Sequence, residues 1–327
     1  MTEKVTFFPA YGYQDASGWQ APLQAWVHED AIVPAAVAAL AALLGVNGRE
    51  ELRIFHERSR DFLADSESRE TVTFCFDNDP SATDHSISNG RTDANGLING
   101  TFALTLSEAA ALLTRQGSTD GLLTFRASSR GHVGAGRMQL IPPTGLSVIS
   151  DIDDTIKETG VPSGAMTVVR NTFFREFEAI AGMAAAYAAS GATAFHYVSG
   201  SPFQLYAPLA DFLTGATFLP GTLHLKLVTK DLLSCRTWEA LCKLVLDPDG
   251  TYNHKVAEII DLMRRFPGRR FLLVGDSGEK DPEIYREILR RFPSQVQEIR
   301  IRDVVNARVD DPSRLVGMTI IPGPDLR

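Results

Sequence analysis

Three carboxylates lie within four residues of one another, directly after a short apolar run. The run covers 146–149, and Asp151, Asp153 and Asp154 follow it in the string Ser150-Asp-Ile-Asp-Asp-Thr155. Like charges this close either raise one another's pKa or require a cation. A helix N-cap explains one aspartate, but three at the end of an apolar run indicate acid–base chemistry or a metal site.

Groups suited to binding an anion occur at two further places. Ser199 and Gly200 follow the apolar run 195–198 and precede an expected helix. A hydroxyl and free backbone N–H groups at such a point can hold phosphate oxygens, although an ordinary helix cap explains them equally well. Lys255 lies early in the expected helix 252–266, where a solvated lysine is the alternative interpretation.

Two more aspartates follow another apolar run, 271–274. They are Asp276 and Asp281 in the string Gly275-Asp-Ser-Gly-Glu-Lys-Asp281. The letters GDSG also surround the nucleophile of chymotrypsin-like proteases, which use an all-β barrel and an upstream histidine. Here the string lies between an expected strand and an expected helix, so we reject the protease interpretation.

The elements that must position these residues alternate between strand and helix. Such alternation predicts a doubly wound α/β domain, in which helices cover both faces of a parallel sheet and ligands bind beyond the carboxyl ends of the strands. The expected strands are 146–149, 195–198, 224–228, 271–274 and 298–301, and the expected helices are 170–189, 203–213, 252–266 and 282–292.

The first 145 residues have a different pattern, of short β-like runs separated by turn formers. The runs are 6–8, 23–28, 71–76, 100–104, 122–127 and 137–141. Helical stretches are expected at 34–44 and 49–64. We therefore predict three parts: a β-sandwich-like accessory domain with a helical insertion at 1–145, the α/β domain at 146–310, and a C-terminal tail at 311–327.

Composition excludes several classes of protein. The chain has 327 residues and a net charge of −8, whereas proteins that bind nucleic acid through phosphate contacts are usually basic. Cys75, Cys235 and Cys242 have no CxxC spacing, which argues against a zinc site or a disulfide framework. The start lacks a signal-peptide core, and no apolar stretch reaches the roughly 20 residues of a spanning helix. We expect a cytoplasmic protein for which peripheral membrane contact is allowed.

Taken together and in this order, the four motifs resemble those of the haloacid-dehalogenase-like phosphatases. Longer strings resemble the branch of phosphatidate phosphatases related to lipin, most closely the branch of the yeast actin-patch-associated phosphatidate phosphatase. The resemblance covers 146–305, about half of the chain. The strings are Asp151-Ile-Asp-Asp-Thr-Ile-Lys157, Tyr197-Val-Ser-Gly-Ser-Pro202, Leu223-His-Leu-Lys226 and Gly275-Asp-Ser-Gly-Glu-Lys-Asp-Pro-Glu-Ile-Tyr285.

The resemblance implies a role for each residue. Asp151 would attack phosphorus and form an aspartyl-phosphate. Asp153, which must then be protonated, would donate a proton to the leaving oxygen and afterwards activate water. Asp151, the backbone carbonyl of Asp153, and Asp276 would hold Mg²⁺. The remaining residues are Ser199, Gly200 and Lys255, which would bind the phosphoryl group, and Asp281, which would hold Lys255 or a metal-bound water.

The implied activity is hydrolysis of phosphatidate, a phospholipid, to diacylglycerol and phosphate. Two alternatives stay open: the same chemistry on a soluble or protein-borne phosphomonoester, and an inert binding module. The cap between the first two motifs is expected to be minimal, because only 156–194 are available for it.

Two groups of residues have a functional and a structural interpretation. Apolar side chains around the second motif either contact acyl chains or, as we favour, pack in the core: Phe173, Phe174, Phe177, Met183, Phe203, Leu205, Tyr206, Leu209, Phe212 and Leu213. Late arginines either bind a headgroup or, as we favour, end helices: Arg264, Arg265, Arg269, Arg270, Arg290 and Arg291. Asp154 is either a cap or a support for the site.

Overall fold

The computed structural model describes most of the chain and divides it into two compact units. The described residues are 3–29, 38, 39, 41, 42, 44–46, 48–81, 83–87, 90–228, 243 and 247–323. Unit 1 contains 1–32 and 64–143, and unit 2 contains 33–63 and 144–327. Cys235 and Cys242 lie outside the described residues, as does most of the expected helix 34–44, whereas Cys75 is a buried free thiol.

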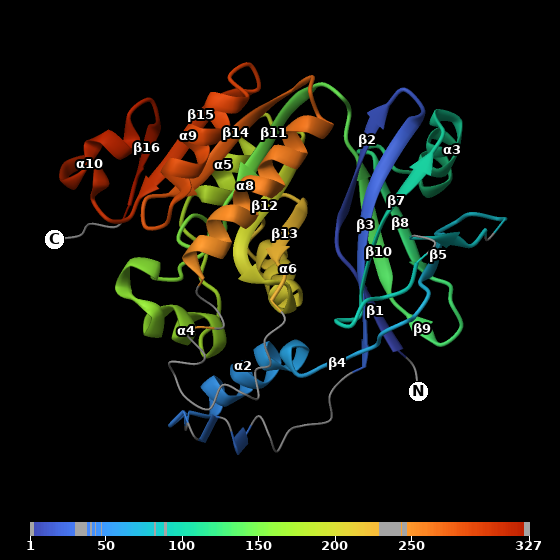
Figure 1. The fold of residues 1–327 in the computed structure, drawn as a ribbon, viewed down its shortest axis with the longest axis horizontal. Coiled ribbons are helices and arrows are strands. Elements are labelled where there is room, and N and C mark those ends of the chain that lie inside the picture. The colour runs from blue at the N-terminus through green and yellow to red at the C-terminus, as the bar shows by residue number, and fades with distance from the viewer. Residues whose placement is uncertain are drawn as a thin grey trace. The chain divides into compact units, whose positions relative to one another are not determined.

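Unit 1 is predominantly β (Figure 1), and its arrangement as a sandwich stays a prediction. Among the described residues its strands form one network in the order β6-β5-β8-β10-β2-β3-β1-β9, with β4 and β7 paired to β3. The strands are β1 (Glu3–Phe7), β2 (Ala10–Asp15), β3 (Gly18–Glu29), β4 (Asp65–Ser66), β5 (Thr73–Phe76), β6 (His85–Ser86), β7 (Leu97–Leu104), β8 (Leu122–Ala127), β9 (His132–Val133) and β10 (Ala135–Leu140).

The core of unit 1 is aromatic. Phe74 lies at its centre, 4.8 Å from the ring of Phe125 and 5.2 Å from that of Phe102 between ring centroids. A helix that the sequence analysis missed, α3 (Leu106–Gln116), also packs in this unit. Thr105 and Glu108 form a capping box at its N-terminus, so the pattern T-x-x-E was an available signal.

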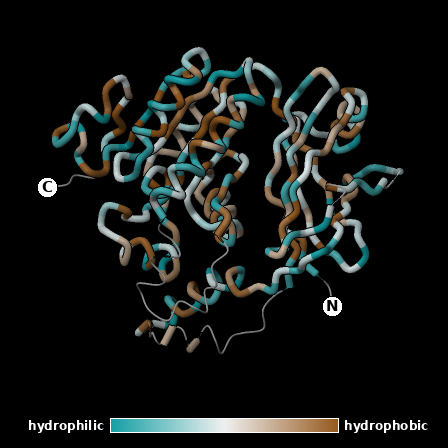
Figure 2. Tube along the Cα trace, viewed as in Figure 1, coloured by the Kyte–Doolittle hydropathy of each residue, from teal (hydrophilic) through white to brown (hydrophobic). Residues whose placement is uncertain are grey.

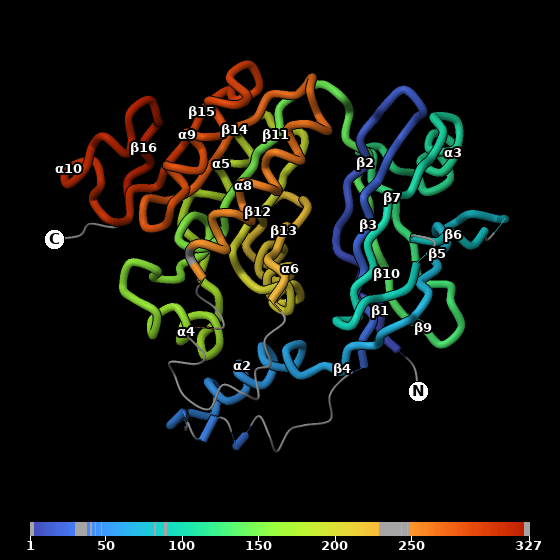
Figure 3. The backbone as a smooth tube through the Cα atoms, viewed as in Figure 1, coloured from blue at the N-terminus to red at the C-terminus, as the bar shows by residue number. Residues whose placement is uncertain are grey.

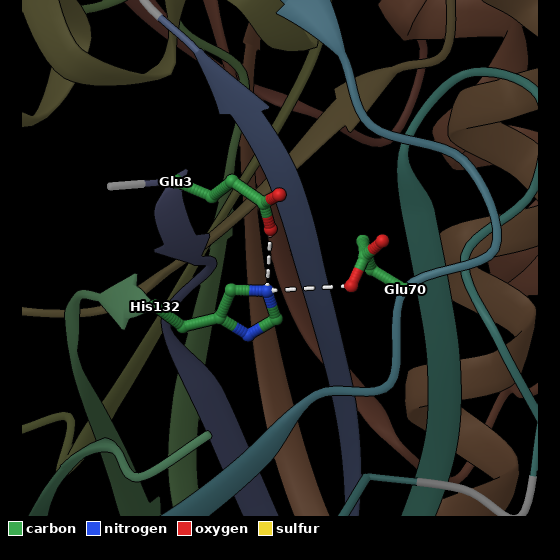
Figure 4. A group of neighbouring side chains, drawn as sticks. All are labelled: Glu3, Glu70 and His132. Atoms are coloured by element: carbon green, nitrogen blue, oxygen red, sulfur yellow. Dashed lines mark hydrogen bonds and ion pairs between the residues drawn. The ribbon is translucent and has the colours of Figure 1, made fainter. Parts of the chain in front are cut away.

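An acidic pair around one histidine joins β9 to β1 in unit 1. His132 Nε2 lies 2.7 Å from Glu3 Oε2 and 3.8 Å from Glu70 Oε2 (Figure 4). Glu3 and His132 are also register partners in the parallel β1–β9 pair. The histidine therefore links the short strand β9 to both β1 and the segment before β5.

Unit 2 is an α/β structure built on a parallel sheet, as predicted. The strand order is β13-β12-β11-β14-β15-β16, and every pair in it is parallel. The strands are β11 (Gly145–Ser150), β12 (Ala194–Pro202), β13 (Thr222–Lys226), β14 (Arg269–Asp276), β15 (Val296–Asp303) and β16 (Thr319–Pro322). Figure 2 shows hydrophobic residues recurring along these central strands.

Both faces of this sheet carry helices. Val148, Tyr197 and Leu272 belong to the core that includes α5 and α6 side chains, while α8 packs on β12 and α9 on β14 and β15. Successive strand residues point to opposite faces, so Ile149 and Leu273 face the second layer. The helices are α4 (Ala165–Phe173), α5 (Met183–Ala188), α6 (Tyr206–Gly215), α8 (Pro248–Arg265), α9 (Asp281–Arg291) and α10 (Ala307–Asp310), with 3-10 turns η2 (Val161–Ser163), η3 (Phe203–Leu205) and η5 (Pro312–Leu315).

Three sequence-based expectations need correction. The helix expected at 170–189 is two helices, α4 and α5, because 178–180 form backbone hydrogen bonds with 156–158 instead of continuing the helix. The expected tail 311–327 contains η5 and β16, and β16 pairs with β15 at the edge of the sheet. Helix α2 (Arg49–Ser59), followed by η1 (Arg60–Phe62), belongs to unit 2 although it precedes most of unit 1 in sequence.

Helix α2 is held in unit 2 by aromatic packing. Phe55 is fully buried and stacks on Phe174 with ring centroids 4.7 Å apart. Arg58 donates to the carbonyl oxygen of Thr172 over 2.8 Å. These contacts make the segment a structural part of the α/β unit.

We expect Phe55→Ala to lower the free energy of unfolding of unit 2 by about 3–5 kcal/mol, because it leaves a cavity in a closed core. Peptide-resolved hydrogen exchange should show faster exchange in 144–323 and unchanged exchange in unit 1. Phe125→Ala, also fully buried, is the matched control and should reverse the pattern. Loss of protection in unit 1 for Phe55→Ala would contradict the assignment of α2.

Candidate active site

The four sequence motifs converge at the carboxyl edge of the parallel sheet. Asp151 follows β11, Ser199 and Gly200 lie at the end of β12, and Asp276 ends β14. Lys255 reaches this edge from α8. Asp151, Ser199, Lys255, Asp276 and Asp281 are all buried. Lys255 contacts Asp151 and Asp281, an oxygen of Asp276 lies within 4.8 Å of oxygens of both, and Ser199 contacts Asp153, so the structure brings the candidate side chains into one region.

A single ammonium group lies among carboxylates at the centre of this region. Lys255 Nζ is 2.7 Å from Asp151 Oδ1, 2.8 Å from Glu279 Oε2 and 2.8 Å from Asp281 Oδ1. Burial alone would lower the pKa of Lys255, but these three carboxylates raise it well above its usual value. Lys255 is therefore a buried cation, and Asp281 holds it in place.

The carboxylates outnumber this cation. Burial raises the pKa of Asp151 and of Asp276 well above the usual range, and the neighbouring carboxylates of Asp281 and Glu279 add to the effect. Lys255 opposes the rise without cancelling it. The region is thus short of positive charge, which a bound cation would supply.

One carboxylate oxygen is left for such a cation. Asp276 Oδ1 accepts from the N–H groups of Gly278 (2.6 Å) and Glu279 (3.2 Å). Its other oxygen, Oδ2, is buried and has no hydrogen-bond partner among the residues that the structure describes. Oxygen atoms of Asp151, Asp276 and Asp281 all lie within 4.8 Å of one another, a donor set that suits a hard divalent cation.

Asp153 has a different environment from the other aspartates. Its Oδ1 lies 2.8 Å from Lys157 Nζ, and Thr159 donates to it over 2.8 Å. Its Oδ2 accepts from Ser199 (3.1 Å) and Ser201 (3.0 Å). Burial would raise the pKa of Asp153, but Lys157 and the hydroxyl donors lower it to about 2. The free protein therefore holds Asp153 ionised, whereas the role implied by the resemblance requires it protonated.

The remaining aspartate, Asp154, holds the backbone rather than the reacting centre. Its carboxylate accepts from the N–H groups of Thr159 (2.8 Å), Gly160 (2.7 Å) and Val161 (2.5 Å). Its own φ of 54° is left-handed, a conformation that aspartate tolerates better than most residues. Asp154 is thus a support for the loop that follows the first motif.

A cavity of about 400 Å³ opens beside these groups. Asp153, Gly200 and Lys255 are among the residues that line it. Its other walls combine small aliphatic side chains with polar ones: Thr159, Val161, Val168, Thr172, Ser201, Asp247, Thr251, Tyr252, Gly278, Glu279, Lys280, Ile284 and Arg314. The lining thus combines cationic, acidic, hydroxyl and aliphatic groups around one space.

The cavity is lined neither by the apolar side chains around the second motif nor by the late arginines, the two groups for which the sequence left two interpretations. Nine of the ten apolar side chains around the second motif pack in or against the core of unit 2, and Phe203 is buried as well, so the core interpretation is confirmed. The interpretation as helix ends is wrong for Arg269 and Arg270, which lie in β14. Arg269 is buried and donates to the carbonyl oxygens of Thr144 and Leu146. Arg264 and Arg265 lie in the last turn of α8, as Arg290 and Arg291 do in α9.

Several site residues escaped the sequence analysis. Lys157 and Thr159 contact Asp153, Glu279 contacts Lys255, and Thr155 Oγ1 donates to Asp151 over 3.2 Å. Lys157 and Glu279 stand inside the quoted motifs, so their charge next to the aspartates was the available signal. The same motifs supply the residues that the structure brings together at this edge of the sheet.

Comparison with known proteins supports the same segment. Residues 146–303 match the family model described as phosphatidate phosphatase APP1, catalytic domain. Phosphatidate phosphatase APP1 of Saccharomyces cerevisiae is 35% identical over 178 residues, which are 53% of this chain and 28% of that protein. An uncharacterized protein of Schizosaccharomyces pombe is 30% identical over 167 residues, 50% of this chain and 26% of that protein. The predicted resemblance is confirmed, and the chain spans about a quarter of the length of these relatives.

We expect Lys157→Met to raise the pKa of Asp153, because burial then acts without the opposing ammonium. In the wild type the folded-state pKa of about 2 lies below the usual 3.8. Ionised Asp153 therefore stabilises the fold above about pH 4, and this stability is lost as the pH falls through about 2. Carboxyl ¹³C NMR, with Asp153→Asn to assign the signal, should show Asp153 ionised at pH 4 in the wild type only.

Lys280→Met is the matched control, because Lys280 is half-exposed and its ion pair is with Asp249. It should leave the titration of Asp153 unchanged. A wild-type Asp153 that titrates at or above pH 4 would contradict the dominant role of Lys157.

Proposed function

We propose that this protein is a Mg²⁺-dependent phosphatidate phosphatase that works through an aspartyl-phosphate. The observation that carries the proposal is that the catalytic-domain match, 146–303, falls on the segment that holds the buried Asp151–Lys255–Asp276 cluster. Under this proposal unit 2 is a haloacid-dehalogenase-like domain with a minimal cap, formed by residues between β11 and β12.

The donor set of the site fits Mg²⁺. Asp151 and Asp276 would hold the ion together with the backbone carbonyl of Asp153, and Asp276 Oδ2 is the buried oxygen that otherwise has no partner among the described residues. Mg²⁺ prefers such oxygen ligands and keeps several waters or substrate oxygens. When bound, the ion would neutralise charge on the phosphoryl group.

The first step transfers the phosphoryl group to the protein. An Asp151 oxygen forms a bond to phosphorus while the bond from phosphorus to the glycerol oxygen breaks. Asp153 gives its proton to that oxygen, so diacylglycerol leaves as a neutral alcohol. Ser199 and the N–H of Gly200 bind phosphoryl oxygens, and Lys255 balances the charge that gathers near Asp151.

The second step restores the protein. Water attacks phosphorus, and Asp153 takes the proton that the water loses. The bond between phosphorus and the Asp151 oxygen breaks, which releases inorganic phosphate and returns the carboxylate. Asp153 thus alternates between its two protonation states once in each turnover.

The ionised state of Asp153 in the free protein is compatible with this cycle. Its low pKa depends on Lys157 and on hydroxyl donors that include Ser201. A phosphate group bound at Ser199 brings negative charge next to Asp153, and a nearby like charge raises a carboxyl pKa. Substrate binding would therefore be the event that protonates Asp153.

The mixed lining of the cavity supports an amphiphilic substrate. Val161, Val168 and Ile284 line it together with the polar groups, and Met166 in the adjacent helix α4 is 41% exposed. No helix among the described residues is long and apolar enough to cross a membrane. A phospholipid would then be reached by peripheral contact, which we include in the proposal.

We expect the purified protein to release phosphate from phosphatidate in detergent micelles only when Mg²⁺ is present. Asp151→Asn should lower the rate on the order of 10³-fold or more, because the nucleophile is lost. Asp249→Asn is the matched control, since Asp249 is 91% exposed, and it should keep the wild-type rate. If the protein hydrolyses soluble phosphomonoesters but not phosphatidate, the lipid substrate is excluded and the proposed mechanism stands.

A further inference from the structure

The chain segment after β15 is built into the catalytic unit. It contains α10, η5 and β16, and Figure 3 traces it in red back to the edge of the sheet, where β16 pairs with β15. Arg286 of α9 donates to the carbonyl oxygens of Ser313 (3.0 Å) and Arg314 (2.7 Å). Turn η5 is therefore fixed on α9, although it lies beyond the segment that the family model matches.

Arg314 of this turn reaches the loop that carries the fourth motif. Its Nη1 donates to the carbonyl oxygen of Ser277 (3.0 Å), and its Nη2 donates to that of Glu279 (2.9 Å). Glu283 holds the other side of the guanidinium, with Oε1 2.6 Å from Nε and Oε2 3.0 Å from Nη2. The side chain is about three-quarters buried and lines the cavity.

One peptide group links Arg314 to Asp276. The carbonyl of Ser277 and the N–H of Gly278 belong to the same peptide, so the guanidinium donates at one end while the N–H donates to Asp276 Oδ1 over 2.6 Å at the other. Hydrogen bonds in such a chain polarise and strengthen one another. The peptide fixes Oδ1, while Oδ2 is buried and has no hydrogen-bond partner among the described residues. A carboxylate oxygen of Asp276 lies within 4.8 Å of oxygens of Asp151 and Asp281, so the orientation of this carboxylate decides what the three aspartates can offer a cation.

We propose that Arg314 is a positioning residue for the cation site, acting on Asp276 through the peptide between Ser277 and Gly278. The proposal rests on the proposed function, because it concerns the same metal. An arginine is needed because its planar fork presents several donors in fixed directions, whereas a lysine presents one compact charge. The C-terminal segment would then be required for metal affinity as well as for the sheet.

The test compares Arg314→Ala, Arg314→Lys and the wild-type chain. Two readouts are taken: the Mg²⁺ concentration for half of the rise in melting temperature, with MgCl₂ as the only added ligand, and the Mg²⁺ concentration for half-maximal phosphatidate hydrolysis. Loss of a residue that orients a metal ligand typically weakens metal binding by roughly 10–100-fold. We expect that shift in both readouts for Arg314→Ala and a smaller shift for Arg314→Lys.

Arg308→Ala is the matched control. Arg308 lies in the same segment, is half-exposed, and is 3.8 Å from its acidic neighbour Asp303. It should leave both Mg²⁺ midpoints within twofold of the wild type. If Arg314→Ala does not fold, Arg314→Lys, which keeps the charge, still decides the question through its Mg²⁺ midpoints.

The outcomes separate this inference from the proposed function. A lower melting temperature with unchanged Mg²⁺ midpoints would show that Arg314 only supports the fold, and would overturn the inference. A wild-type protein that is stabilised by Mg²⁺ but does not hydrolyse phosphatidate would overturn the proposed function alone, since the melting data still rank the Arg314 variants. A wild-type protein that does not respond to Mg²⁺ would overturn both.

Discussion

The structure of unit 2 depends on one buried ammonium group shared by three carboxylates. Lys255 could not be buried alone, because an unpaired charge in the interior is strongly destabilising, and neither could Asp151 or Asp281. The burial of each charged group is stable only because the oppositely charged groups lie next to it. Helix α8 must therefore bring Lys255 to the edge of the sheet where Asp151 follows β11 and Asp276 ends β14.

Backbone N–H groups donate to carboxylate oxygens that Lys255 does not contact. Asp281 Oδ2 accepts from the N–H of Asp276 over 3.2 Å, while its other oxygen holds Lys255. This approach needs glycine at position 275, where a Cβ atom would lie 2.4 Å from Asp281 Oδ2. At the first motif, Asp154 plays the corresponding part with three successive N–H groups. The turns after β11 and β14 are thus folded around carboxylates.

Much of the site could be predicted from sequence because parallel strands end at a common edge. Asp151, Ser199 and Asp276 each follow an apolar run, and that local relation was sufficient to predict that they lie close together. The partners of Asp153 were harder to predict. Lys157 reaches it through a tight turn in which the N–H groups of Ile156 and Lys157 both donate to the carbonyl oxygen of Ile152, and 156–158 then pair with 178–180. The same pairing interrupts the expected helix 170–189, since helical periodicity carries no information about backbone hydrogen bonds to a distant segment.

The role of the aromatic residues near the second motif follows from the position of α2. Phe173 and Phe174 pack against Phe55, and Phe177 lies beneath Arg58, 3.5 Å from ring centroid to guanidinium carbon, and also 4.7 Å from Lys157 Nζ. These rings hold an early segment of the chain on unit 2, so they are not available to line the cavity. The aliphatic part of the cavity lining comes from Val161, Val168 and Ile284 instead. Lys157, whose Nζ lies 4.7 Å from the ring centroid of Phe177 and 2.8 Å from Asp153 Oδ1, joins this aromatic packing to the polar groups that line the cavity. A change in the packing of α2 would therefore act on Asp153 through Lys157.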